Sequence, residues 1–246
     1  IGNSDTVIGI YKKKKLYKTY RTETKNKNFK KIISEFFKNK IIFNLKSNEK
    51  ICVISSVVPE VNKIIVFLLK KNSFKIKNIN IQNIPKKIKF KYAKSQLGAD
   101  RIANSFSGVN KYGSNIIIID FGTATTFDVI KNNVYIGGTI APGIIVSHES
   151  LIKKASKLKK ISIKKISSVI GKNTEQSMRA GFYWGYVNLI NGIIKKIIKE
   201  KKYKPKIILT GGLAQIYKKE IKFNSYYEPN LTLEGLYLIG LQNHDW

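Results

Sequence analysis

Residues 115–128 read N-I-I-I-I-D-F-G-T-A-T-T-F-D, and this stretch carries the strongest fold signal in the chain. Four isoleucines run into Asp120, the chain turns at Gly122, and residues 125–130 continue with threonines followed by apolar side chains. A short β-branched run that ends at a glycine is typical of a buried strand. The polar–apolar pattern after the glycine predicts a second strand that folds back on the first as a hairpin.

The turn of this hairpin has the residues that a phosphate site needs. Gly122 lets main-chain N–H groups approach a ligand closely. Thr123, Thr125 and Thr126 add hydroxyl groups, and Asp120 lies where a cation would be held near phosphate. The stretch therefore predicts a phosphate-holding hairpin, although an ordinary hairpin with a glycine turn explains these residues equally well.

The beginning of the chain repeats this pattern. Residues 1–8 read I-G-N-S-D-T-V-I, and aligning Gly2 with Gly122 places Asn3 on Thr123 and Thr6 on Thr126. Short sequence periods indicate solenoids, whereas a period near half the chain indicates a duplicated domain. We therefore expect two similar halves whose glycine turns face one nucleotide.

Six short motifs occur in a fixed order along the chain. They are Gly2-Asn3-Ser4, Ser55-Ser56-Val57-Val58-Pro59, Gly98-Ala99-Asp100-Arg101, Asp120-x-Gly122-Thr123-Ala124-x-Thr126, Gly137-Gly138-Thr139-Ile140-x-Pro142-Gly143 and Thr210-Gly211-Gly212. This series resembles the type III pantothenate kinases of the actin-like and sugar-kinase superfamily. The resemblance extends from Gly2 to Leu236, which is nearly the whole chain.

The resemblance implies an α/β fold made of duplicated actin-like (ribonuclease H-like) domains with a nucleotide cleft between them. Residues 1–112 would form the N-terminal domain and residues 113–246 the C-terminal domain. It also implies a kinase that uses ATP to convert pantothenate to 4′-phosphopantothenate, the first step of coenzyme A biosynthesis. An accessory transcriptional regulator without kinase activity is the alternative, because some relatives have that role.

The resemblance also implies a role for particular residues. Asp100 would be the general base, Asp120 would bind a monovalent cation (K⁺ or NH₄⁺), and Mg²⁺ would arrive with ATP. The chain would form a homodimer with a shared active site, in which Thr174 reaches pantothenate from the partner subunit. The expected pantothenate contacts are Tyr92, Gly98, Ala99, Asp100, Arg101 and Thr174, and the expected ATP contacts are Gly2, Asn3, Ser4, Asp5, Thr6 and Thr123.

The sequence departs from the family pattern in two places. The family's first motif begins with an aspartate directly before the residue equivalent to Ile1, and that aspartate and an initiator methionine are missing, so we expect that the first few residues are not included. Tyr92 also precedes Gly98 by one residue fewer than the family spacing. Two of the proposed site residues have simpler explanations: Asp100 is favoured at a helix start by the helix dipole, and Thr174 is a good helix cap.

The net charge of +31 raises the possibility of a nucleic-acid or anionic-membrane binder. However, 43 of the 46 basic residues are lysines, whereas phosphate and base recognition favour the bidentate fork of arginine. The lysines are scattered among abundant Ile, Asn, Phe and Tyr, the set that an AT-rich coding sequence favours. We therefore attribute the charge to compositional drift, and we expect no specific nucleic-acid partner.

Other features of the sequence point to a cytoplasmic protein with no membrane association. There is no apolar run of about 20 residues and no recognisable leader. The single cysteine, Cys52, lies in an apolar run, which predicts a buried reduced thiol rather than a nucleophile. His148 and His244 have no acidic or cysteine neighbours at ligand spacing, which argues against zinc, and no P-loop motif is present.

The hydrophobic periodicity and the glycine and proline positions predict the remaining elements. Strands are expected at 7–11, 16–22, 51–55, 76–81, 116–120, 125–130, 134–140 and 206–210. Helices are expected at 29–37, 59–71, 99–112, 143–159, 174–202 and 233–241, with loops at 86–95 and 161–174 and a hinge at Gly113-Ser114.

Overall fold

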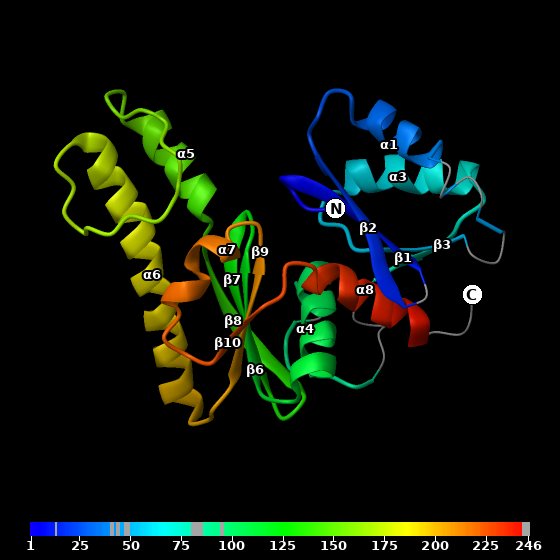
Figure 1. Cartoon of the computed structure of the whole chain (residues 1–246). Helices are drawn as coiled ribbons and strands as arrows, with labels where there is room; N and C mark the ends of the chain where they lie inside the picture. Colours follow the sequence, from blue (N-terminus) through cyan, green and yellow to red (C-terminus); the bar gives the residue numbers. More distant parts are fainter. Residues whose placement is uncertain are drawn as a thin grey trace. The chain divides into compact units, whose positions relative to one another are not determined.

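The computed structural model describes residues 1–12, 14–39, 42, 45, 46, 50–79, 86–93 and 96–242 (Figure 1). The chain forms two compact units. The first comprises Ile1–Ile88, Tyr92–Ser107 and Leu231–Trp246, and the second comprises Lys89–Lys91 and Gly108–Asn230. The sequence-based division at residue 112 differs from this one in two respects: the second unit also takes residues 108–112 and Lys89–Lys91, and the first unit includes the last helix.

The second unit is built on a six-stranded mixed sheet in the order β10-β9-β6-β7-β8-β5. The predicted hairpin is confirmed: β6 pairs antiparallel with β7 from Ile116↔Ile130 to Phe121↔Thr125. The four isoleucines of β6 are fully buried, as a central strand requires. The strands are β5 (Lys89–Phe90), β6 (Ile116–Phe121), β7 (Ala124–Lys131), β8 (Val134–Pro142), β9 (Lys206–Gly211) and β10 (Ser225–Tyr227).

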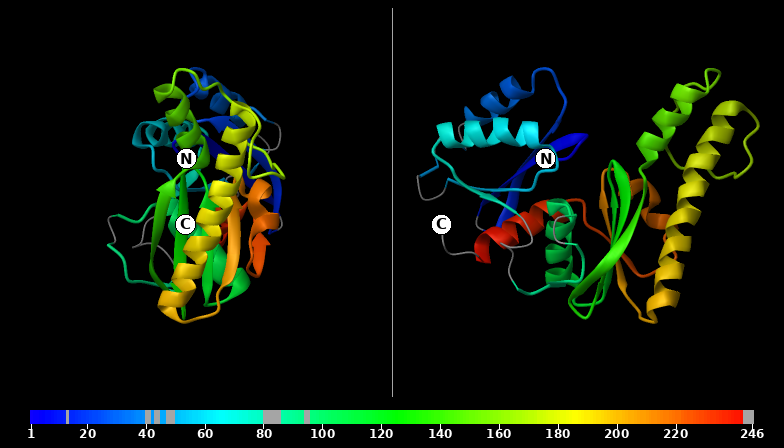
Figure 2. Two further views of the ribbon diagram at one scale, coloured as in Figure 1. Left: turned by 90° about the vertical axis from the view of Figure 1, so that its left-hand side faces the viewer. Right: turned by 180° about the vertical axis from the view of Figure 1, so that it is seen from behind.

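Helices cover this sheet on both faces (Figures 1 and 2). The long helix α6 (Thr174–Lys201) packs Tyr183, Val187, Ile190 and Ile194 against the apolar side chains of β6 and β9. On the other face Gly108, in the C-terminal turns of α4 (Ala99–Tyr112), lies against isoleucines of β6 and β9. The unit also contains α5 (Ile144–Lys154), the short α7 (Ala214–Tyr217) and the 3₁₀ turn η3 (Lys218–Glu220).

The first unit contains two separate two-stranded sheets among its described residues. β1 (Asp5–Lys12) pairs antiparallel with β2 (Lys15–Glu23), and β3 (Ile51–Ile54) pairs parallel with β4 (Lys75–Asn78). In Figure 1 the helices α1 (Phe29–Phe37) and α3 (Pro59–Lys71) lie on one side of these strands and α8 (Leu231–Gln242) on the other. The apolar stripe of α1, with Phe29, Ile33 and Phe37, forms the core with Ile65 and Leu69 of α3.

The two hairpins β1–β2 and β7–β8 have the same construction. Each has strands of eight and nine residues that are separated by two residues in the sequence, and each has a register shift near this connection, at Ile10/Tyr11 in one and Val129/Ile130 in the other. Each residue of β1 therefore corresponds to the residue 119 positions later in β7. This correspondence supports the duplication that the sequence predicted.

The sequence alignment of the two halves needs one correction. Gly2 and Gly122 are equivalent, because each donates its N–H to the carbonyl of the first strand residue, Asp5 or Ala124. The first turn is one residue longer, however, so Thr6 corresponds to Thr125 and not to Thr126. An insertion in a turn leaves the hydrophobic alternation of the strand intact, so the sequence pattern does not reveal it.

Most of the predicted elements are confirmed within a few residues. The helix predicted at 143–159 ends earlier, at Lys154, and the loop predicted at 86–95 contains the short strand β5. The strand predicted at 76–81 is found as β4, while residues 80 and 81 lie outside the described part of the chain. The short elements α7, η3 and β10 were not predicted.

Two general properties of the chain bear on its function. Within the described residues, no helix combines the length and the apolar character that crossing a bilayer requires. Burial raises the pKa of the Cys52 thiol to about 12. The reactive thiolate form is therefore scarce at neutral pH. The Cys52 side chain is partly rather than fully buried.

Candidate functional site

The first glycine turn, Gly2 to Asp5, is held closed by Thr24. The Thr24 hydroxyl donates to the Gly2 carbonyl (2.7 Å) and lies 3.0 Å from the Thr6 hydroxyl, and the Thr24 N–H donates to the Ser4 carbonyl (2.8 Å). Thr6 and Thr24 are buried, whereas Asn3 and Ser4 are exposed. Thr24 therefore supports the turn from behind, and no signal in the sequence identified it.

The predicted ATP-contacting residues of this turn thus have different environments. Asn3 and Ser4 present their side chains to solvent, where a ligand is accessible to them. Asp5 forms an ion pair with Arg21 (2.8 Å), and the Thr6 hydroxyl bonds to Thr24 inside the unit. The Thr6 hydroxyl therefore helps to stabilise the turn.

The second glycine turn is Gly122-Thr123, between β6 and β7, and both residues are exposed. Gly143 packs directly behind it: a Cβ at Gly143 would lie closer than 3.0 Å to the carbonyl oxygens of Gly122 and Thr123. Gly143 is the counterpart of Thr24, 119 positions later. One turn is thus closed by a hydroxyl group and the other by a close backbone approach that only glycine permits.

The Asp120 carboxylate lies beside this second turn, close to Gly211. Gly211 has a φ of +91°, and a Cβ there would lie 2.5 Å from Asp120 Oδ1 and 2.6 Å from the Phe121 nitrogen. Gly212, the next residue, is exposed with open space around its Cα. The structure therefore brings Asp120, Thr123 and the Thr210-Gly211-Gly212 motif together at one end of the sheet, where β6 and β9 end side by side.

The Gly98-Ala99-Asp100-Arg101 motif forms the start of α4. Asp100 Oδ1 accepts a hydrogen bond from the Arg101 N–H (2.8 Å), and a Cβ at Gly98 would overlap the same carboxylate oxygen. The Arg101 side chain is buried, and its guanidinium carbon lies 5.9 Å from the centre of the Tyr92 ring. Tyr92 therefore belongs to this cluster despite its unusual spacing from Gly98.

Thr174 is the first residue of α6 and is exposed. The helix is capped by Asn173, whose side chain accepts a hydrogen bond from the Gln176 N–H (2.9 Å), and the Gln176 side chain accepts in turn from the Lys172 N–H (3.0 Å). The alternative explanation of Thr174 as the helix cap is therefore wrong, because the adjacent asparagine fills that position. No capping requirement explains a threonine here.

The loop that leads into Thr174 is fixed to the rest of the unit by several contacts, among them two polar ones. The buried His148 accepts a hydrogen bond from the Ile161 N–H (3.3 Å). Further along, Lys165 forms an ion pair with Glu220 (2.6 Å), which also accepts a hydrogen bond from the Tyr183 hydroxyl (2.8 Å). His244, the other histidine, lies outside the described residues.

The Glu220 contacts lead to a pH-dependent prediction. Hydrogen bonds from Lys165 and Tyr183 lower the pKa of the Glu220 carboxyl group. A lowered folded-state pKa contributes stability above the unfolded pKa of about 4.3, and this contribution is lost as the pH falls through the folded value. We expect Glu220→Gln to reduce the free energy of unfolding by about 1 kcal/mol or less at pH 7, because the pair is partly exposed.

Urea unfolding at several pH values tests this expectation. The difference between wild type and Glu220→Gln should shrink as the pH falls below about 4. Glu200→Gln is the matched control, since Glu200 is an exposed glutamate that pairs with its sequence neighbour Lys201 (2.7 Å) rather than with a distant segment. A Glu220→Gln effect that stays constant down to pH 3 would contradict the proposed origin.

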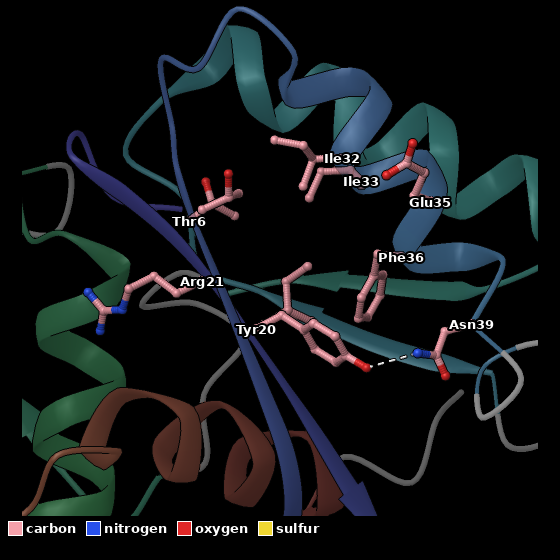
Figure 3. Close-up of a pocket in the computed structure, with 10 residues that line it drawn as sticks. Thr6, Tyr20, Arg21, Ile32, Ile33, Glu35, Phe36 and Asn39 are labelled. Carbon is pink, nitrogen blue, oxygen red and sulfur yellow. Dashed lines mark hydrogen bonds between the residues drawn. The ribbon is translucent and has the colours of Figure 1, made fainter.

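A pocket of about 280 Å³ lies between the β1–β2 hairpin and α1 (Figure 3). The Asn39 side-chain amide donates to the Tyr20 hydroxyl (3.1 Å) at one end of it. The lining is largely apolar, with Ile32, Ile33 and Phe36 contributed by α1. Among the predicted site residues only Thr6 lines this pocket, so its chemistry does not suit a polyphosphate.

The described residues contain no group of three or more His, Cys, Asp or Glu side chains arranged to hold a metal ion. Two acidic residues lie at the glycine turns: Asp5, which is paired with Arg21 (2.8 Å), and Asp120, which lies beside Gly211.

Comparison with known proteins agrees with these observations. The model of the type III pantothenate kinase family matches residues 1–196. The crystal structure of a protein assigned to the Baf family of transcriptional activators, from Campylobacter jejuni, is similar with a TM-score of 0.59 and 21% identity over 94% of both chains. The ethanolamine utilization protein EutJ from Carboxydothermus hydrogenoformans has a TM-score of 0.55 and 11% identity, over 97% of this chain and 87% of its own. The structural similarities concern the fold, which is the actin-like α/β class that the sequence predicted.

Proposed function

The chain belongs to the type III pantothenate kinase family, and we propose that it transfers a phosphoryl group from ATP to the primary hydroxyl of pantothenate. The product would be 4′-phosphopantothenate, the first intermediate of coenzyme A biosynthesis. The observation that best supports this proposal is the cluster at the start of α4. There the Asp100 carboxylate is oriented by the Arg101 N–H, and the buried guanidinium of Arg101 lies near the ring of Tyr92.

Asp100 is the proposed general base. Phosphoryl transfer requires the acceptor hydroxyl to be aimed at the phosphate and to lose its proton. The Arg101 N–H holds Asp100 Oδ1, and Gly98 leaves space for that oxygen. A carboxylate held in this way accepts the hydroxyl proton without first having to find its orientation. Arg101 would pair with the carboxylate of pantothenate.

The two glycine turns are the proposed ATP contacts. Gly122 and Thr123 are exposed at the end of β6, and Asn3 and Ser4 are exposed in the first turn. Backbone N–H groups in such turns suit phosphate oxygens. Mg²⁺, bound largely through those oxygens, would neutralise phosphate charge. Asp120, beside Gly211, is the proposed ligand of a monovalent cation, K⁺ or NH₄⁺.

A product assay tests the proposed function. The protein is incubated with ATP, Mg²⁺ and pantothenate, with K⁺ or with Na⁺ only, and 4′-phosphopantothenate is measured by mass spectrometry. We expect product that depends on pantothenate and increases with K⁺. Phosphorylation of another small alcohol in preference to pantothenate would instead indicate a different substrate within the same chemistry.

We further propose a homodimer in which Thr174 completes the partner's pantothenate pocket. Most apolar side chains of α6 pack into the core of its own unit. This helix alone therefore does not provide an interface. Exposed apolar residues are found instead on α5 and in the loop before Thr174, two segments that lie side by side (Figures 1 and 2). They are Ile145, Val146 and Leu151 of α5 and Val169 and Ile170 of the loop.

Mixing two inactive variants should restore activity if the site is shared. We expect Asp100→Asn and Thr174→Arg proteins to be weakly active alone. After subunit exchange, a heterodimer would have one site with both wild-type residues and one with both changes, so activity should recover partially. Two results would contradict the shared site. One is that activity does not recover although native mass spectrometry shows that the subunits have exchanged. The other is that a monomer is fully active.

The alternative function is a transcriptional regulator. It is favoured by the net charge of +31 and by the fold similarity to the Baf family structure. Against it, the chain keeps Asp100, Arg101, Asp120 and Thr123, and a regulator without kinase activity would not need to keep all four.

Binding to DNA distinguishes these two functions. If the charge reflects composition, affinity for random duplex DNA should be weak near 150 mM salt and should fall steeply as salt increases, through counterion release. The measurement is fluorescence anisotropy with duplexes of several sequences over a salt series. Preference for one sequence by about 10³-fold or more over random DNA would support the regulator.

A further inference from the structure

The second glycine turn, Gly122-Thr123, packs against the short segment that joins β8 to α5. This segment is Pro142-Gly143, and its glycine is buried. A Cβ at Gly143 would lie 2.1 Å from the Thr123 carbonyl oxygen and 2.7 Å from that of Gly122. Two backbones in such close contact move together, because no flexible side chain lies between them. The position of the turn therefore depends on what fixes the segment behind it.

The regular structure on either side of this segment restrains it only weakly. The last pair of the β7–β8 ladder is Ala124↔Pro142, and proline has no N–H to donate to the partner strand. Gly143 then adopts an extended backbone (φ −71°, ψ 153°) before α5 begins, and among the described residues no side chain caps that helix. The junction between β8 and α5 therefore needs a restraint from elsewhere in the unit.

Tyr186 of α6 provides this restraint. Its side chain is buried, and its hydroxyl group donates a hydrogen bond to the Pro142 carbonyl (3.1 Å) and lies 2.7 Å from the Ser147 hydroxyl. A tyrosine hydroxyl has one proton, so the Ser147 hydroxyl is the donor in the second bond. The two partners lie directly before Gly143 and one helical turn after it. One hydroxyl group thus fixes the chain on both sides of the glycine.

The ring of Tyr186 is in turn fixed by other aromatic side chains of the unit. The Phe182 ring lies nearly parallel to it, with centroids 6.5 Å apart and an interplanar angle of 16°. The Tyr217 ring lies at the same centroid distance and at an angle of 50°. A ring that is buried among such neighbours has little freedom to move. Its hydroxyl group is therefore a fixed point for the junction.

We propose that Tyr186 is a positioning residue for nucleotide binding: its hydroxyl group fixes the Pro142-Gly143 backbone, and this backbone fixes the Gly122-Thr123 turn. The inference rests on the proposed function, in which this turn contacts the phosphates of ATP. A turn that is already ordered binds phosphate more tightly, because less conformational entropy is lost on binding. In this role Tyr186 acts through the backbone and is not a catalytic residue.

Tyr186→Phe tests the proposal, because it removes the hydroxyl group and keeps the ring. The first measurement, by NMR without nucleotide, is the hydrogen-exchange rate of the Gly122 amide, which donates to the Ala124 carbonyl (3.1 Å). The second is the Kd for MgATP by isothermal titration calorimetry. We expect exchange to be about tenfold faster and MgATP binding about tenfold weaker, since two restraining hydrogen bonds are lost. In turnover, the KM for ATP should rise while the KM for pantothenate changes little.

Two further variants separate this role from a general loss of stability. Tyr183→Phe is the matched control, because Tyr183 is a buried tyrosine of the same helix whose hydroxyl donates to Glu220 (2.8 Å) and not to the junction. It should leave the Gly122 exchange rate and the affinity for MgATP nearly unchanged. Ser147→Ala removes one of the two partners of Tyr186 and keeps the bond to Pro142. It should change both quantities in the same direction as Tyr186→Phe, but less.

Two results would overturn the proposal. One is a folded Tyr186→Phe protein whose Gly122 amide exchanges at the wild-type rate; if that variant does not fold, the same result for Ser147→Ala has the same meaning. The other is an equal effect of Tyr183→Phe, which would show that any lost hydrogen bond of α6 disturbs the turn. If the wild-type protein binds no MgATP, the proposed function fails, whereas the exchange rates still decide whether Tyr186 fixes the turn.

Discussion

Asp100→Asn should fold normally and lose about 10²-fold or more of kcat in the proposed phosphoryl transfer to pantothenate. In the wild type, Asp100 Oδ1 accepts a hydrogen bond from the Arg101 N–H (2.8 Å). Asparagine has nearly the same shape as aspartate, and its side-chain oxygen can still accept this hydrogen bond. It does not accept the proton of the acceptor hydroxyl, however. The loss should therefore appear mainly in kcat, while the KM values for ATP and pantothenate change little.

Asp100 also lies in the first turn of a helix, so its charge contributes to helix stability. Glu60→Gln is the matched control, because Glu60 is an exposed acidic residue in the first turn of α3 and belongs to no candidate site. Both changes should cost about 1 kcal/mol or less in unfolding free energy. Only Asp100→Asn should reduce turnover, and a folded Asp100→Asn protein with wild-type kcat would exclude Asp100 as the base.

Gly235→Ala should destabilise the protein by about 3 kcal/mol or more. Gly235 of α8 lies directly against the backbone of α4: a Cβ there would lie closer than 3.0 Å to the carbonyl oxygen, carbonyl carbon and Cα of Ala103. Backbone atoms cannot move aside as a flexible side chain can. An alanine at this position would force α4 and α8 apart. Their separation would also weaken the hydrogen bond that the Thr232 hydroxyl donates to the Asn104 side-chain oxygen (2.7 Å).

The same substitution elsewhere gives the control. Gly185 lies in the exposed face of α6, and a Cβ there would have no neighbour within 4 Å. Gly185→Ala should therefore stabilise the protein, by up to about 1 kcal/mol, because alanine has the higher helix propensity. Urea denaturation measures both effects. Equal unfolding midpoints for Gly235→Ala and wild type would show that α4 and α8 do not pack as described.

Much of the local structure could be predicted from the sequence. The isoleucine run before Asp120 and the alternation after Gly122 predicted the β6–β7 hairpin, and Pro59 marked the first residue of α3. The motif order indicated the family, which the family model confirmed. These features are local. The burial of a strand, the hydrophobic periodicity of a helix and the conformational freedom of a glycine each depend on residues that are close together in the sequence.

The tertiary structure decided the features that depend on residues far apart in the chain. The sequence suggested Thr174 as a possible cap, but the adjacent Asn173 accepts the bond from Gln176. Thr24 closes the first turn across the hairpin, and Gly143 closes the second by backbone approach. α8, the last helix, packs with the first unit because Gly235 fits against Ala103. Such contacts depend on which surfaces meet after folding, and shape complementarity between distant segments leaves no periodic signal in the sequence.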